Sequence, residues 1–133
     1  MAAGTSPIFP QTPIIGIANL VSNTAVTSRQ ARSGTAGLTA LTTTSTDGTR
    51  IDIIKVVGQS NSNSALQTIW IYDGSSSYVY DEIAIAAVTS NANTQPAANT
   101  ASYSTLVLPP TYQLFTSQTV SSNVVVYAFG GKY

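Results

Sequence analysis

The stretch "LQTIWIYDG" (66–74) decides the fold class, because it has the pattern of a β-strand that runs into a turn. Alternate side chains of a strand point to opposite faces of the sheet. Ile69 and Ile71 therefore lie on one face, and Trp70 and Tyr72 lie on the other. Both faces are apolar, whereas one face of a small antiparallel sheet normally meets water. The second face needs a cover, which either this chain or another molecule must supply.

Strand patterns of this kind recur along the chain, separated by turn signals roughly every 8–12 residues, and no convincing helical period competes with them. Asp-Gly turns and polar Ser/Asn-rich loops separate the strands, as in β-hairpins. The sequence predicts an all-β protein, a single antiparallel β-sandwich or jelly roll of about eight strands. The expected strands are 13–21, 38–44, 50–57, 66–72, 78–88, 103–108, 112–117 and 123–129.

The N-terminal residues 1–12 are expected to form an extended arm rather than part of the sandwich. Pro7 and Pro10 lie within this segment, and proline disfavours a helix there. Its large apolar side chains are Ile8 and Phe9. We therefore divide the chain into an arm, 1–12, and one β-sandwich domain, 13–133.

Composition restricts the partners that this chain can have. Charged residues make up 8% of the sequence, against roughly 25% in ordinary soluble proteins. Five basic and five acidic side chains give zero net charge, so the chain offers no electrostatic attraction to nucleic acid. Near-zero charge also removes the repulsion that keeps copies apart. We expect self-association, and no nucleic-acid partner.

The first residues, "MAAGTSPIFPQTP", lack a positive region followed by a continuous apolar run, so we expect no secretion signal. No apolar stretch approaches the ~18 residues of a membrane helix. We expect synthesis in the cytoplasm and no membrane partner.

The residue types available make catalysis an unlikely role. Histidine and cysteine are both absent, which removes the commonest general base, thiol nucleophiles and zinc sites of the His/Cys type. Asp47 and Asp73 each precede glycine, a pattern typical of turns whose carboxylate holds backbone N–H groups. The neighbours Asp81 and Glu82 point to opposite faces of a strand. We expect no enzyme activity, no cofactor and no metal site.

The apolar second face predicts an interface between subunits. The strand 123–129 repeats the pattern, with Tyr127 and Phe129 opposite a set of small apolar residues. Exposed together, such side chains would form a larger patch than monomers usually carry. We expect Trp70, Tyr72, Tyr127 and Phe129 to lie in a subunit interface. The alternative is a β-bulge that swaps the faces within a strand.

A second set of residues is expected to dock on a partner surface. Ile8 and Phe9 of the arm, together with Ile14, provide apolar contacts, and Arg29 and Arg32 give the neighbouring loop 22–37 a positive charge. Two alternatives stay open here. The arginines can be solvated loop residues, and the tyrosines with Trp70 can form a platform on which a sugar stacks.

The segment from Gly48 to the end resembles a family of small virion proteins of tailed bacteriophages, the capsid decoration or cement proteins. The matching stretches are "GTRIDIIKVVG", "SALQTIWIYDG", "YDEIAIAAVT", "LVLPPTYQLFTS" and "NVVVYAFGGKY". The family positions met here are Gly48-Thr49, Asp73-Gly74, Glu82-Ile83, Leu108-Pro109 with Tyr112, and Gly130-Gly131. Residues 1–47 lie outside the resemblance.

The resemblance implies a jelly-roll protein that binds the major capsid protein, commonly as a homotrimer, and stabilises the head. Its place is then the capsid surface of the virion, after synthesis in the host cytoplasm. The alternative function is a receptor- or carbohydrate-binding knob of a phage fibre, which would carry aromatic residues on loops at one end of the sandwich.

Overall fold

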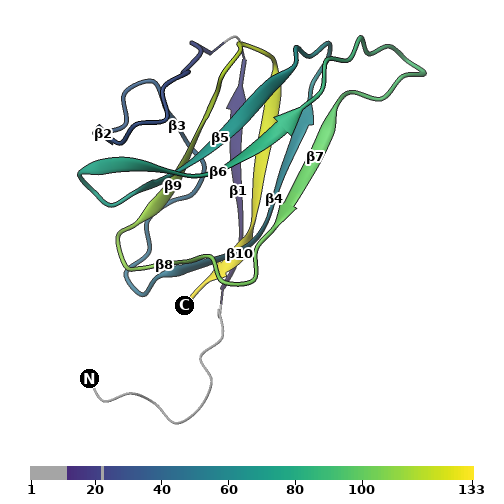
Figure 1. Cartoon of the computed structure of the whole chain (residues 1–133). Coiled ribbons are helices and arrows are strands. Elements are labelled where there is room, and N and C mark those ends of the chain that lie inside the picture. The colour runs from purple at the N-terminus through teal and green to yellow at the C-terminus, as the bar shows by residue number, and fades with distance from the viewer. Residues whose placement is uncertain (1–11, 22) are drawn as a thin grey trace.

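A computed structural model describes residues 12–21 and 23–133 of the chain (Figure 1). Within these residues every regular element is a β-strand and no helix occurs, so the expected all-β class is confirmed. The strands are β1 (Thr12–Leu20), β2 (Arg32–Ser33), β3 (Thr39–Ala40), β4 (Thr49–Gly58), β5 (Ala65–Tyr72), β6 (Ser76–Ile85), β7 (Ala98–Ser102), β8 (Val107–Leu108), β9 (Gln113–Gln118) and β10 (Val124–Lys132).

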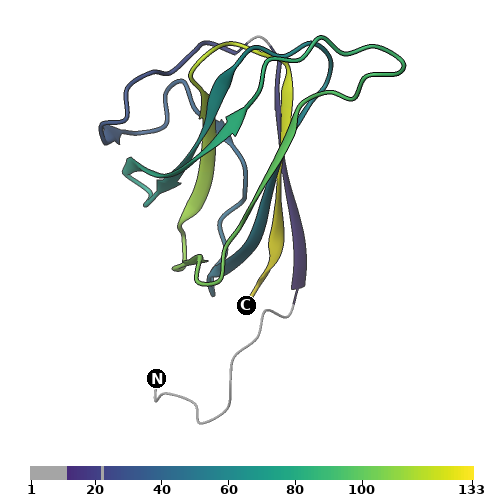
Figure 2. The ribbon, with the colours of Figure 1, turned by 45° about the vertical axis from the view of Figure 1, so that its right-hand side comes forward.

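These strands form two five-stranded antiparallel sheets that pack face to face as a β-sandwich (Figures 1 and 2). The first sheet has the order β1-β10-β4-β7, and β8 also pairs with β4. We call it the terminal sheet, because it contains the first and last strands. The second sheet, called the central sheet, has the order β2-β6-β5-β9-β3.

The hydrophobic core lies between the two sheets. Ile54 and Val126 of the terminal sheet and Ile69 and Leu114 of the central sheet are completely buried in one cluster. Removing one large apolar side chain from water contributes roughly 1.5–3 kcal/mol, so this layer supplies the main favourable term of folding. The sandwich core therefore accounts for the apolar side chains on the inward face of each strand.

The expected strands agree with the observed ones wherever the apolar pattern was strong. The stretches 13–21, 50–57, 66–72, 78–88, 112–117 and 123–129 correspond to β1, β4, β5, β6, β9 and β10. The expected strands 38–44 and 103–108 shorten to the two-residue strands β3 and β8. Strands β2 and β7 lie in stretches that were expected to be loops. Strand β7, "ANTAS", is mostly exposed and joins the edge of the sheet through backbone pairing with β4, so it has no apolar alternation to detect.

Strand β5 keeps its two apolar faces along its whole length. Its pairing with β9 runs without interruption from Gln67 to Tyr72. A shift in register does occur against β6, between Ile69 and Trp70, but the extra residue, Tyr80, lies on β6. The faces of β5 are therefore not swapped, and the cover of its second face must be found elsewhere.

The two ends of the described chain lie together, and one long loop projects at the opposite end. Thr12 at the start of β1 pairs with Lys132 at the end of β10. The connection 86–97 between β6 and β7 extends away from the C-terminus in both views (Figures 1 and 2). Residues 91–95 at its tip are exposed, with a small bridge between Asn91 and Thr94.

Candidate functional site

The second face of the central sheet is covered by the chain's own segment 23–37, which we call the strap. Val26 donates its backbone N–H to the Gln118 carbonyl at 2.9 Å, which ties the strap to β9. At the other side of the sheet, β2 within the strap pairs with β6. The Ser77 hydroxyl donates to the Gly34 carbonyl at 2.7 Å. The strap thus spans the face that carries Trp70.

Trp70 is sealed under this strap. The guanidinium carbon of Arg32 lies 5.1 Å from the centre of the indole ring, a cation–π arrangement. The indole Nε1–H donates to the Ser117 hydroxyl at 2.9 Å. Trp70 is completely buried, so the chain leaves none of its surface for a neighbouring subunit. The sequence prediction that placed Trp70 in a subunit interface therefore needs correcting, because the strap already occupies that side of the ring.

The other aromatic residue predicted on this face, Tyr72, is half-buried. Its ring packs edge-on against Phe115, with the ring centres 5.5 Å apart. This contact joins β5 to β9 across the face. Tyr72 thus has a partner within the chain and keeps part of its surface exposed.

The two arginines that were expected to dock on a partner are engaged within the chain. Arg29 forms an ion pair with Glu82 of β6, and its Nη2 lies 3.0 Å from Glu82 Oε2. This pairing raises the pKa of Arg29 further. Arg32 covers Trp70 and donates from Nη1 to the Ala36 carbonyl at 3.0 Å. Sequence reasoning missed this role of the strap, since a Ser/Thr-rich loop resembles a solvated one; its unusual length was the available signal.

The outer face of the terminal sheet is the surface with no cover among the described residues. Cross-strand pairing places Ile15 beside Phe129 and Ile17 beside Tyr127, and Phe129 in turn lies beside Ile53. Ile15 and Ile17 are 62% and 59% exposed, and Ile53 is 38% exposed. The rings of Tyr127 and Phe129 are stacked, with centres 6.2 Å apart. We call Ile15, Ile17, Ile53, Tyr127 and Phe129 the apolar face.

Charge is sparse on this surface. Lys55 pairs with Tyr127 in the sheet and is exposed. Near the β8 end of β4, Arg50 Nε donates to Asp52 Oδ1 at 2.8 Å, which neutralises both groups locally. A contiguous apolar surface with one unpaired cation at its middle is the kind of area that monomeric proteins rarely expose. Tyr127 and Phe129 thus lie half-buried on this open surface, and their place in a subunit interface stays a prediction.

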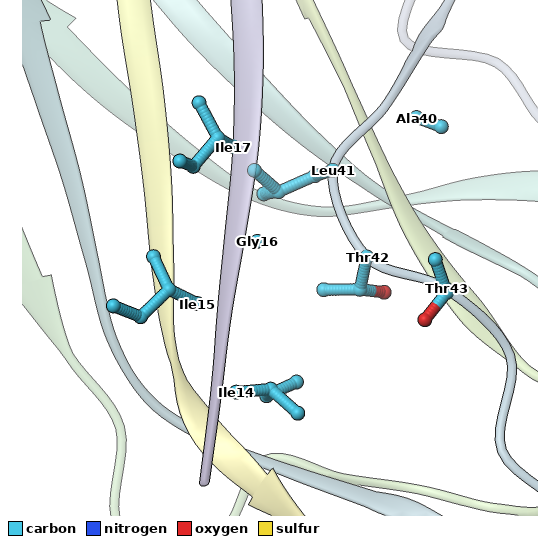
Figure 3. A pocket seen from close by; sticks show the side chains of 8 residues that line it. All are labelled: Ile14, Ile15, Gly16, Ile17, Ala40, Leu41, Thr42 and Thr43. Atoms are coloured by element: carbon cyan, nitrogen blue, oxygen red, sulfur yellow. The ribbon is translucent and has the colours of Figure 1, made fainter.

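A groove of about 350 Å³ adjoins the apolar face at the edge of the sandwich. It lies between β1 and the segment 40–43, as Figure 3 shows, and Ile14 is among its lining residues. Gly16 allows this close approach, because a Cβ there would lie 2.2 Å from the carbonyl oxygen of Leu41. Ile14, predicted as a docking residue, is thus at an open groove. The predicted docking residues Ile8 and Phe9 lie outside the described residues.

The acidic groups of the described residues do not converge, and several of them hold local structure. Asp73 holds the β5–β6 turn through its carboxylate. Tyr103 donates its hydroxyl to Asp81 Oδ2 at 2.7 Å, and burial together with that carboxylate raises the pKa of Tyr103. Across residues 12–21 and 23–133 there is no cluster of three or more acidic groups that could hold a metal ion. The same residues include no helix that is long and apolar enough to span a membrane.

Comparison with families of known proteins, with curated proteins and with solved structures finds no match to this chain. The apolar face and the groove beside it are therefore the features from which a function has to be argued.

Proposed function

We propose that this chain is a non-catalytic structural protein of a virion, a capsid decoration or cement protein that works as a homotrimer on the capsid surface. In this proposal the apolar face binds the lattice of the major capsid protein after synthesis in the host cytoplasm. The observation that carries the proposal is the exposure of Ile15, Ile17 and Ile53 on one regular sheet surface. A protein that binds only the intact shell stabilises that shell by mass action.

The nature of the apolar face favours binding to a large, regular partner. Four long or medium strands form a rigid platform, and the side chains on it point one way. Strands β1, β4 and β10 have 9 or 10 residues each, and β7 has 5. At ~3.3 Å per residue and ~4.8 Å per strand they cover roughly 500 Å², which is more than half of the roughly 800 Å² per partner that a stable interface of standard size buries. Zero net charge removes the long-range repulsion between many copies on one shell.

The order of strand pairing supports a jelly roll as the finer description of the sandwich. The chain pairs from its ends inward: β1 with β10, β3 with β9, β4 with β7 and β8, and β5 with β6. A long hairpin rolled into two sheets gives this nested order, and viral capsid proteins and lectins both use jelly rolls. The fold therefore agrees with the structural role but does not select it over carbohydrate binding.

The carbohydrate-binding alternative requires aromatic rings gathered on loops at one end of the sandwich. The exposed aromatic residues of the described chain, Tyr78 and Tyr80, lie within β6. Tyr127 and Phe129 lie within β10 on the flat face. This placement favours a broad protein contact over a sugar pocket.

The test is to add purified protein back to shells that lack it and measure occupancy by sedimentation. The Ile53→Ser/Tyr127→Ser variant alters the apolar face away from the groove. Each lost apolar contact is worth roughly 1.5–3 kcal/mol, so affinity should fall at least about tenfold. The matched control is Val120→Ser, which changes an exposed apolar residue of the β9–β10 connection. Unchanged saturation by the Ile53→Ser/Tyr127→Ser variant would refute the proposal.

A further inference from the structure

The outward edge of β1 is an unpaired strand edge. Strand β1 pairs with β10 on one side, and no described residue pairs with its other side. It is nine residues long, has no charged residue, and exposes Ile15 and Ile17. An edge of this length and apolarity is a template for another strand, and soluble proteins usually blunt or cover it. Pro13 blunts only the start of this edge, so residues 14–20 stay open to another strand.

The groove beside this edge defines what kind of occupant fits. Ile14 of β1 lies on one side of the groove, and Leu41, Thr42 and Thr43 of the segment 40–43 lie on the other (Figure 3). None of the described lining residues is charged, although Lys132 donates from Nζ to the Thr43 hydroxyl at 2.9 Å. A neutral, extended segment with one or two large apolar side chains matches this lining.

We propose that the edge of β1 binds residues 7–10 of the N-terminal arm of a second copy of this chain, added as a short strand. The segment "PIFP" has no charged side chain, and Ile8 and Phe9 are its large apolar residues. It lies in the part of the chain that precedes Thr12, close to where β1 begins. The proposal rests on the self-association within the proposed function, and it does not require the capsid role.

The arm of the same chain cannot bring Ile8 and Phe9 to this edge, because a hairpin turn ahead of β1 would pair them with the wrong residues. Strand β1 already begins at Thr12, so the tightest reversal would use Pro10 and Gln11 as a two-residue turn. Such hairpin turns need a positive φ at their first central residue, which proline cannot adopt. Even that turn would place Phe9 opposite Thr12, short of Ile15 and Ile17. A longer turn would move the apolar pair further away still, whereas a second copy is free of this limit.

Ile8 and Phe9 would point to the two faces of the sheet at the edge of β1. Neighbouring residues of a strand point to opposite faces, so one of Ile8 and Phe9 would enter the groove beside Ile14. The other would extend the apolar face next to Ile17. This single added strand would cover the groove and lengthen the platform described above.

The flanking prolines give the added strand a defined end. Pro7 and Pro10 are an odd number of positions apart, so their nitrogens face opposite edges of a strand. The proline facing away from β1 removes a donor from the new outer edge and blocks further strands. An arm passed from each copy to the next is a heterologous contact, and such a contact forms a ring, as in the proposed homotrimer, when the rotation between copies closes.

Disulfide capture tests the contact directly, because the natural chain has no cysteine. Chains carrying Ile8→Cys or Phe9→Cys are coexpressed with differently tagged chains carrying Ile17→Cys. Adjacent strands bring paired Cα atoms to about 4.5–5.5 Å, within the range of a disulfide. We expect a bond between the two tagged chains for one arm variant, and none when Ile17→Cys is replaced by Ser104→Cys, a change at an exposed turn residue. No bond with either arm variant overturns the proposal.

Deleting residues 1–11 provides the second measurement, read by light scattering and by shell binding in parallel. We expect the oligomer to fall to monomer mass, while circular dichroism still shows the sandwich. If the truncated protein stays oligomeric, the arm does not join the copies. If it stays oligomeric and also loses shell binding, the arm contacts the capsid instead, which contradicts the proposal. Should the deletion prevent folding, the Ile8→Ser/Phe9→Ser variant replaces it, and an unchanged oligomer mass overturns the proposal equally.

Discussion

Asp73 shows how a single carboxylate fixes the turn between β5 and β6. Its Oδ1 accepts the backbone N–H of Ser76 at 2.7 Å and that of Ser75 at 2.9 Å. These bonds favour the ionised form, so they lower the pKa of Asp73. Gly74 follows with a φ of 95°, a conformation that glycine adopts without strain. Asp47 also precedes a glycine, but its carboxylate accepts no hydrogen bond from the described residues.

The lowered pKa of Asp73 makes its contribution to stability depend on pH. A depressed carboxylate pKa stabilises the folded state above the unfolded value of about 3.9 and loses that effect as pH falls through the folded value. Asp73→Asn should therefore be less stable than the natural protein at pH 7, and the difference should shrink in acid. Urea unfolding at both pH values measures this, with Asp47→Asn as the matched control. An equal difference at both pH values would contradict the explanation.

The strap is the element that sequence reasoning could not foresee. Most of its residues are small and polar, and it is held by backbone hydrogen bonds, the Arg29–Glu82 ion pair and Arg32 over the indole of Trp70. None of these leaves a periodic signal. In contrast, β4 and β10 were predictable because burial of alternate residues imposes a two-residue period on the sequence. Strand β5 is buried on both faces and was predictable from its apolar residues ahead of the Asp73-Gly74 turn. The sequence pattern therefore predicted correctly that Trp70 is removed from water, but it did not predict that the strap covers it.

Removing the Arg32 side chain should loosen the strap over Trp70. Arg32→Ala loses the cation–π contact, worth up to about 2 kcal/mol when desolvated, and admits water to the ring. We expect the fluorescence of Trp70, the only tryptophan, to shift to longer wavelength and the unfolding midpoint to fall. Arg29→Ala serves as the control, because the ion pair of Arg29 is largely exposed and exposed pairs contribute little. An unchanged emission spectrum for Arg32→Ala would show that the Arg32 side chain does not hold the strap over Trp70.

At the level of the whole molecule, the residues that the structure describes cover one of the two outer sheet faces and leave the other open. Fold class and most long strands followed from the sequence, because the core determines them. The sequence could not show which outer sheet face the chain covers. Trp70 and Tyr127 lie on strands with similar apolar patterns, and only tertiary contacts distinguish the two residues. The groove at Gly16 was equally hidden, because it depends on β1 meeting the segment 40–43.

Self-association through the edge of β1 and the groove beside it should respond to salt in a characteristic way. Strand β1 has no charged residue, none of the described residues lining the groove is charged, and the whole chain has no net charge. Raising sodium chloride from about 0.05 to about 0.5 M screens charges and should leave the oligomer mass unchanged. Ammonium sulfate should strengthen the association, because it favours burial of apolar surface. Dissociation on adding sodium chloride, followed by light scattering, would indicate instead that ion pairs hold the copies together.

The projecting loop 86–97 is a suitable site for inserting a foreign peptide. Its exposed tip at 91–95 lies at the end opposite the C-terminus and the start of β1 (Figure 1). Exposed loop tips with small polar residues accept insertions best. A foreign epitope placed between Asn91 and Thr94 would be held outward from the sandwich, clear of the apolar face. In the proposed capsid role, each copy on the shell would then present that epitope to the surrounding medium in a regular array.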